Sequence, residues 1–341
     1  MVMRKVPVEE AVGMVLGHEL TKIVPGEYKG PAFRKGHIIQ PEDIAHLKSI
    51  GKDHIYLFEL GNNEIHENQA AKRLAEAAAG LGLTIDAPSE GRANLKAAVN
   101  GILEVNSAAV TAINMTDNVA LATLHNGTVV EAGTTVAGAK IIPLVIAEDL
   151  IQQVEASARQ YQPVITVKAM KNKKVGVIVT GNEVFYGRIT DKFAPVFANK
   201  VAQYGATLLG TVYQPDDSAS ITASILEFKQ QGADIVIASG GMSVDPDDVT
   251  PEAIRSTGAK VITYGTPVLP GAMFMLAEFE GLTIMGMPAC GMYSRTTILD
   301  LVLPRVLADI PVTKADLAAM GHGGLCMSCK ECVYPHCPFG K

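Results

Sequence analysis

The sequence predicts an α/β fold in which a three-layer, mainly parallel sheet follows an N-terminal α+β accessory region. Val175–Val179 and Asp234–Ala238 are short apolar runs rich in β-branched residues, which is typical of strands buried on both faces. Segments with helical spacing alternate with such runs, as expected when helices cover both faces of a parallel sheet. We therefore predict four parts: a small α/β module (1–60), an accessory α+β region (61–170), a main domain (171–311) and a cysteine-rich tail (312–341).

Composition excludes several classes of protein. The 341 residues include 48% hydrophobic and 19% charged side chains, and the formal net charge is −6. This acidic balance without a basic stripe argues against nucleic acid as a partner. Because no apolar run is long enough to span a bilayer and the N-terminus lacks a signal-peptide pattern, we expect a cytoplasmic protein that does not enter membranes.

The first 170 residues show local patterns without evident chemistry. In the first module, Pro41–Ile50 has helical spacing and His54–Phe58 is typical of a strand. In the accessory region we expect two helices and then a hairpin closed by Asn126 and Gly127, a strong turn signal. The expected helices are Asn68–Ala79 and Ala93–Val105, and the expected hairpin strands are Val119–Leu124 and Thr128–Glu131.

The main domain continues the alternation of strands and helices. Helical spacing is found after Asp191, after Ser218, after Thr250 and after Tyr293. Thr250 is expected to cap its helix, with Pro251 in the first turn. Strand-like runs separate these helices, and in chain order they are 175–179, 207–212, 234–238, 261–264 and 281–285.

Two of the buried strands end in glycine, hydroxyl and carboxylate residues. The first stops at Thr180–Glu183, and the second stops at Ser239–Ser243, which is followed by Asp245, Asp247 and Asp248. Ligands of open α/β sheets bind beyond the carboxyl ends of the strands. Glycines there allow backbone N–H groups to approach an anion. The sequence therefore predicts a ligand crevice between these two strand ends.

These strand ends, with Asp216 and Asp217 after a third strand, resemble the molybdopterin-binding domain of the MoeA/MogA proteins. The resemblance extends from about Val175 to Leu307. It implies that molybdopterin contacts six residues at the strand ends: Thr180, Gly181, Ser239, Gly240, Gly241 and Ser243. It also implies that Glu183, Asp217 (or its neighbour Asp216) and Asp248 are the catalytic acids. Because carboxylates repel a phosphate unless a cation mediates, we expect them to hold Mg²⁺.

The resemblance implies a homodimer that acts in molybdenum cofactor biosynthesis, as a Mg²⁺-dependent transferase that inserts molybdate into adenylated molybdopterin. One alternative is a carrier or sensor of the cofactor, which would meet molybdoenzymes or other biosynthesis proteins. Another is nucleotide hydrolysis. The family usually has Pro-Gly-Lys-Pro where this chain has Pro270–Met273, and Leu-Pro-Gly-Asn-Pro-Val-Ser where it has Met287–Ser294. Because lost lysines remove charges that hold phosphate or molybdate, we expect binding to survive this change better than catalysis.

The tail contains four of the five cysteines. Cys326, Cys329, Cys332 and Cys337 are separated by two, two and four residues, and Pro338 follows. The pattern resembles half of a ferredoxin, with one extra residue in the last gap. In a reducing compartment such a cluster indicates a metal site before disulfides. We therefore predict an iron–sulfur cluster or a Zn²⁺ ion bound by these four thiolates, with an unstructured tail of free thiols as the alternative.

Overall fold

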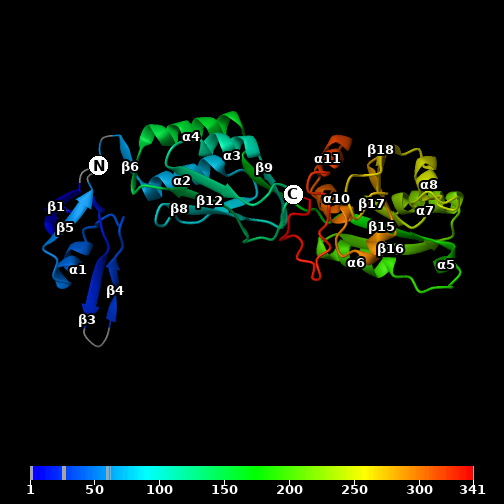
Figure 1. Cartoon of the computed structure of the whole chain (residues 1–341), viewed down its shortest axis with the longest axis horizontal. Helices are drawn as coiled ribbons and strands as arrows, with labels where there is room; N and C mark the ends of the chain where they lie inside the picture. Colours follow the sequence, from blue (N-terminus) through cyan, green and yellow to red (C-terminus); the bar gives the residue numbers. More distant parts are fainter. Residues whose placement is uncertain (1–2, 25–27, 59–60, 62, 341) are drawn as a thin grey trace. The chain divides into compact units, whose positions relative to one another are not determined.

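The computed structural model describes residues 3–24, 28–58, 61 and 63–340, and these form two compact units. Unit 1 comprises residues 1–98, 105–124 and 132–167, and unit 2 comprises 99–104, 125–131 and 168–341. Figure 1 shows the elements of each unit in sequence colours. Within the described ranges, no helix is long and apolar enough to cross a membrane.

The first part of unit 1 is a small antiparallel sheet with one helix. The strand order is β1-β5-β2, and β3 and β4 form a separate hairpin. Leu47 and Leu57 are completely buried in the core of this part. The bounds are β1 (Met3–Pro7), β2 (Val15–Leu16), β3 (Leu20–Val24), β4 (Tyr28–Phe33), α1 (Asp43–Ser49) and β5 (His54–Phe58), with a 3₁₀ turn at Val8–Glu10. The helix and strand expected at 41–50 and 54–58 are confirmed.

The rest of unit 1 is a four-stranded antiparallel sheet, in the order β10-β12-β8-β7, that contacts α2, which in turn packs against α4. Its elements are β6 (Glu64–His66), α2 (Glu67–Ala78), β7 (Leu83–Ile85), β8 (Arg92–Ala97), α3 (Ser107–Asn114), β10 (Val119–Thr123), β12 (Thr135–Ile141), β13 (Val145–Ala147), α4 (Glu148–Gln160) and β14 (Ile165–Ala169), which runs to the boundary of the unit. The expected helix near 68–79 is confirmed.

Two predictions for the accessory region are wrong. The segment 93–105 contains strands β8 and β9 (Gly101–Val105) instead of a helix. In β8, Ala93, Leu95 and Ala97 are buried in alternation, so cross-strand packing overrides the helical propensity of Ala, Leu and Lys. The hairpin is also wrong, because β10 pairs with β12, and β11 (Val129–Val130) pairs with β9.

Unit 2 is built on a six-stranded sheet in the order β16-β15-β17-β20-β19-β18. The first four strands are parallel, and β19 is antiparallel to both of its neighbours. The bounds are β15 (Lys174–Thr180), β16 (Thr207–Gln214), β17 (Ile235–Ser239), β18 (Lys260–Tyr264), β19 (Met275–Phe279) and β20 (Leu282–Met287). The predicted mainly parallel sheet is thus confirmed.

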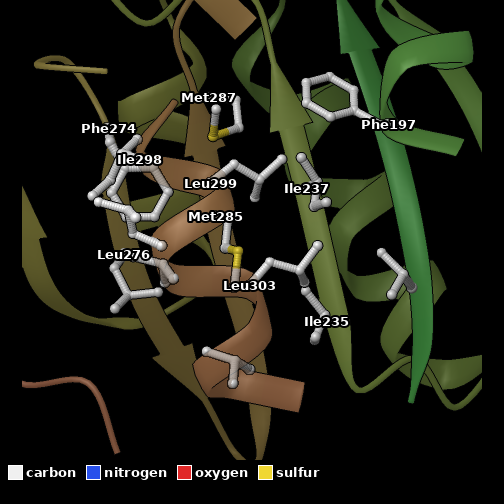
Figure 2. Close-up of a cluster of buried hydrophobic side chains, with 14 of the residues drawn as sticks. Phe197, Ile235, Ile237, Phe274, Leu276, Met285, Met287, Ile298, Leu299 and Leu303 are labelled. Carbon is white, nitrogen blue, oxygen red and sulfur yellow. The ribbon is translucent and has the colours of Figure 1, made fainter. Parts of the chain in front are cut away.

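Helices cover both faces of this sheet, which gives three layers. Val177 and Ile237 face one apolar cluster with α6 (Phe193–Gln203) and α10 (Ile298–Leu307). Figure 2 shows α10 lying across the central strands, with Leu299 and Leu303 directed toward the sheet. Adjacent residues such as Ile178 and Val236 face the opposite cluster with α7 (Ser218–Gln230) and α8 (Thr250–Ser256). The short helices are α5 (Asn182–Phe185), α9 (Cys290–Tyr293) and α11 (Lys314–Ala319).

Candidate ligand-binding crevice

The parallel strands of unit 2 end at one edge of the sheet, as the sequence predicts. Thr180 is level with Gln214 of β16, and Ser239 is level with Val179 of β15 and with Met287 of β20. The predicted Thr180–Glu183 and Ser239–Ser243 segments therefore leave neighbouring strands at the same edge. This edge is the position at which open α/β sheets bind ligands.

The hydroxyl groups of two buried threonines link the strand ends by hydrogen bonds. The Thr180 hydroxyl donates to the carbonyl oxygen of Ser239 at 3.2 Å, and the Thr250 hydroxyl donates to that of Gly240 at 2.8 Å. Thr250 is therefore not the expected helix cap: α8 begins at Thr250 itself, and its side chain bonds to the preceding turn. Because both hydroxyls are used internally, the predicted site residue Thr180 contributes to the shape of the turn.

The glycines between these strands have backbone conformations that other residues rarely adopt. Gly181, Gly240 and Gly241 have φ angles of +140°, +104° and +55°. A Cβ atom on Gly240 would lie 2.3 Å from the carbonyl oxygen of Thr180, which is far inside van der Waals contact. The two strand ends thus approach so closely that only glycine fits at this position.

Ser239 supplies a polar group that this edge does not use. Its side chain is completely buried, and its hydroxyl has no hydrogen-bond partner among the described residues. A buried hydroxyl without a partner costs about 1–3 kcal/mol, so most native structures pair such groups with protein, water or ligand.

Asp216 is the carboxylate that the fold places against the first turn. Its side chain accepts a hydrogen bond from the backbone N–H of Asn182 at 3.0 Å, and its own N–H donates to the Asn182 side chain. Partial burial raises the pKa of Asp216, and the negative charges of Glu183, Asp248 and Asp247 raise it further. The predicted acids Glu183 and Asp248 therefore share one electrostatic environment with Asp216.

Asp217, the other acid proposed from the sequence, has a structural role. It is the N-cap of α7 and accepts a hydrogen bond from the backbone N–H of Ser220 at 2.8 Å. Hydrogen bonds from Ser220 lower the pKa of the Asp217 carboxyl. Sequence reasoning could have separated the two acids, because Asp217 immediately precedes a helix in a position that favours Asp, Asn and Ser.

Asp248 holds the loop that follows β17. It accepts a hydrogen bond from the backbone N–H of Ser243 at 2.9 Å and a weaker one from Asp245 at 3.4 Å. The N–H of the predicted site residue Ser243 is therefore directed at Asp248, while Asp247 is exposed. One Asp248 oxygen makes both of these bonds.

The predicted Mg²⁺ would need several ligands from the residues around the crevice. Within the described ranges, no three His, Cys, Asp or Glu side chains form a group that could hold a metal ion. Mg²⁺ is commonly held by one or two carboxylates together with substrate phosphates and waters. The charges of Glu183 and Asp248 act on Asp216, and Mg²⁺ at this position stays a prediction.

The four tail cysteines line a separate cavity of unit 2 that none of the predicted crevice residues lines. Cys326, Cys329, Cys332 and Cys337 are all free thiols, and all four line one cavity together with the segment Tyr293–Thr296. Cys290 does not line that cavity, and burial raises the pKa of its thiol.

Comparisons with known proteins agree with this description of unit 2. Residues 176–308 match the family described as a probable molybdopterin binding domain, and residues 5–59 match a family described only as a domain of unknown function. The part of the chain that carries the candidate crevice is therefore the part that is similar to this family. Neither match separates MoeA-like proteins from other members of this type, so the MoeA-specific features stay predictions.

Individual relatives cover only part of the chain. A CinA-like protein of Mycobacterium tuberculosis H37Rv is 32% identical over 90 residues, which are 26% of this chain and 21% of that protein. The CinA-like protein of Mycolicibacterium gilvum is 35% identical over 81 residues, 24% of this chain and 19% of the relative. The chain thus spans about a fifth of the length of these curated relatives. The MoaB structure from Thermus thermophilus is 20% identical, with a TM-score of 0.35, over 40% of this chain and 96% of that one.

Proposed function

We propose that unit 2 binds molybdopterin in the crevice beyond β15, β16 and β17, and that the protein acts in molybdenum cofactor biosynthesis. The match of residues 176–308 to the molybdopterin-binding family supports the ligand. The observation that carries the proposal is the position of Asp216, whose carboxyl lies between a glycine turn and the charges of Glu183 and Asp248. In this arrangement, acidic side chains lie directly beside backbone turns that suit a negatively charged ligand.

The two halves of the crevice have different tasks in this proposal. The pterin phosphate lies against the turns at Gly181 and Gly240–Gly241, where no side chain separates the ligand from the backbone. The N–H groups of Gly181 and Gly240 donate to the carbonyl oxygens of Gln214 and Met287. The Ser239 hydroxyl at the end of β17 is a further donor, since it is buried without a partner among the described residues. Asp216 with Glu183 or Asp248 would hold Mg²⁺, which would neutralise the phosphate charge.

Two activities fit this site. Insertion of molybdate into adenylated molybdopterin is the transferase reaction implied by the family resemblance. A carrier or sensor of the cofactor is favoured by a specific observation. Ala272 stands where the resembled family usually has a lysine, and Leu269 stands where another lysine is often found, so positive charges that would hold molybdate are missing. The two activities differ in turnover, since only the transferase converts adenylated molybdopterin and molybdate into the metallated cofactor.

Binding is tested by titrating the full chain with molybdopterin anaerobically, with and without Mg²⁺, and following pterin fluorescence. We expect Mg²⁺ to tighten binding of the pterin. We expect Asp216→Asn to weaken binding about tenfold, or by about 1.4 kcal/mol. Asp234→Asn is the matched control, because Asp234 lies at the other end of β17, where its carboxylate accepts a hydrogen bond from the backbone N–H of Lys174. Parent-like binding by Asp216→Asn, or no pterin binding by the parent, would contradict the proposal. Molybdenum incorporation in the same samples separates the transferase from the carrier.

A further inference from the structure

The cysteine-rich tail is folded onto unit 2. Leu325 forms a β-bridge with Leu269, and the N–H of Cys326 donates to the carbonyl oxygen of Leu269 at 2.8 Å. Phe339 is only 3% exposed and belongs to the core cluster under α10. The tail is thus anchored at both ends, and the alternative of an unstructured tail is wrong for this segment.

A cavity lies between these anchors. Its volume is about 300 Å³, and its walls include all four tail cysteines, Pro270 and Tyr293–Thr296. Cys326 and Cys337 are half-buried against the core, whereas Cys329 and Cys332 are exposed. One wall is fixed, because the Thr296 hydroxyl and the Cys332 sulfur are 3.2 Å apart and form a hydrogen bond.

The residues around the cavity favour a soft metal over a hard one. Arg295 and Lys330 contribute positive charge, and no carboxylate is among the lining residues of the described chain. Hard cations such as Mg²⁺ take oxygen ligands, whereas thiolates select zinc and iron–sulfur clusters. Four thiolates around a metal centre carry excess negative charge, which the guanidinium and the ammonium would offset.

Cavity size distinguishes the two soft candidates. In a zinc site with Zn–S bonds of about 2.3 Å, tetrahedral geometry brings the sulfurs within about 3.8 Å of one another and leaves no space between them. Here the four cysteines instead line a cavity of about 300 Å³. A cluster fills such a volume with its own iron and sulfide.

We propose that the tail binds one iron–sulfur cluster in this cavity, with Cys326, Cys329, Cys332 and Cys337 as its ligands. In two-cluster ferredoxins the fourth cysteine of a related pattern serves the other cluster. In this chain all four thiols line the same cavity, so they supply a complete ligand set for one cluster. The proposal is independent of pterin binding.

The same cavity lies at the edge of the sheet where the candidate crevice is found. Pro270 precedes β19, whose first residue Met275 is level with Gly286 near the end of β20. Tyr293–Thr296 begin at the last residue of α9, the short helix that follows β20 in the chain. Part of the cavity wall, Pro270, Tyr293 and Ser294, thus comes from the two segments that depart from the resembled family, Pro270–Met273 and Met287–Ser294.

The test is anaerobic reconstitution of the full chain with ferrous iron and sulfide, followed by elemental analysis and visible spectroscopy. We expect a brown protein with at least about two iron and two acid-labile sulfide per chain. Cys329→Ser should lose most of this iron, and Cys290→Ser, whose thiol lies outside the cavity, should retain it. One tightly bound zinc per chain with no uptake of iron, or uptake of neither metal, would overturn the proposal.

Thiol accessibility gives a second measurement that needs no variant. Iodoacetamide should modify the four tail cysteines of the native metal-free chain, and the reconstituted chain should be protected at all four positions. Mass spectrometry assigns each modified residue. Protection at only two or three tail cysteines would contradict a four-cysteine cluster, even if Cys329→Ser failed to fold.

Discussion

The two candidate sites of unit 2 lie at one edge of the same sheet, but they are constructed differently. The crevice is made by short turns that continue directly from β15 and β17, and a Cβ atom on Gly240 would lie 2.3 Å from the carbonyl oxygen of Thr180. The cavity is made by an irregular tail that folds back onto segments preceding it by tens of residues. One site therefore depends on strand register, and the other depends on the docking of a tail.

This difference suggests a ranking of substitutions by the contact each one breaks. The largest effect should come from a buried group of hydrogen-bonded side chains beside the cavity, centred on Lys200 and Asp300. Lys200 donates to the Asp300 carboxylate at 2.5 Å and to the carbonyl oxygen of Arg295 at 3.0 Å. The Tyr334 hydroxyl of the tail donates to the carbonyl oxygen of Asp300. Both the cavity wall and the tail are thus hydrogen-bonded to the Lys200–Asp300 group.

Lys200→Met should lower the free energy of unfolding by about 3–5 kcal/mol, because Asp300 would be left as an uncompensated buried charge. Asp300 is only 4% exposed. Denaturant unfolding measures the loss, and exposed Lys192 at the start of the same helix provides the control Lys192→Met, which should stay within about 0.5 kcal/mol. If the two sites are independent, folded Lys200→Met protein should lose a larger share of its reconstituted iron than of its affinity for pterin.

A smaller but still large effect is expected on the crevice side. Gly240→Ala should cost about 2–3 kcal/mol, since alanine would need a strained φ and its Cβ would clash with Thr180. Thermal unfolding of Gly210→Ala is the control, because a Cβ on Gly210 meets nothing within 4 Å. Equal stability of the two variants would show that the strand ends are not as close as described.

The same contrast explains what the sequence predicts and what it leaves open. Strands such as Val175–Val179 and their glycine turns were predictable, because parallel topology aligns strand ends without knowledge of side-chain contacts. The four cysteines were predictable as a group. Their cavity was not, because the bridge between Leu269 and Leu325 joins distant segments that carry no local signal.

Residues 93–105 show a second limit. Their Ala, Leu and Lys content favours a helix, yet β8 pairs with β12 and β7, and β9 pairs with β11. Non-local strand pairing decides the structure of such a segment. Within the crevice, Asp216 and Asp217 were equivalent from composition alone, and the start of α7 separates their roles.

The smallest effects should come from that pair of acids, and they should have opposite signs. Asp216→Asn should raise thermal stability slightly at pH 7, because the pKa of Asp216 is raised by burial and by neighbouring carboxylates. A raised pKa means that the ionised carboxyl destabilises the folded state. The unfavourable contribution of Asp216 is therefore absent below the unfolded pKa of about 3.9 and develops as pH rises through the folded value.

Asp217→Ala should lower stability at pH 7, because it removes the acceptor for the backbone N–H of Ser220. The pKa of Asp217 is lowered, so its contribution is present above the unfolded pKa and is lost as pH falls through the folded one. Both differences from the parent should therefore shrink between pH 7 and pH 3. Added salt should reduce the gain in Asp216→Asn, which arises from burial and in part from repulsion between partly exposed charges, more than the loss in Asp217→Ala. Equal signs for the two variants at pH 7 would show that Asp216 does not belong to the acidic crevice.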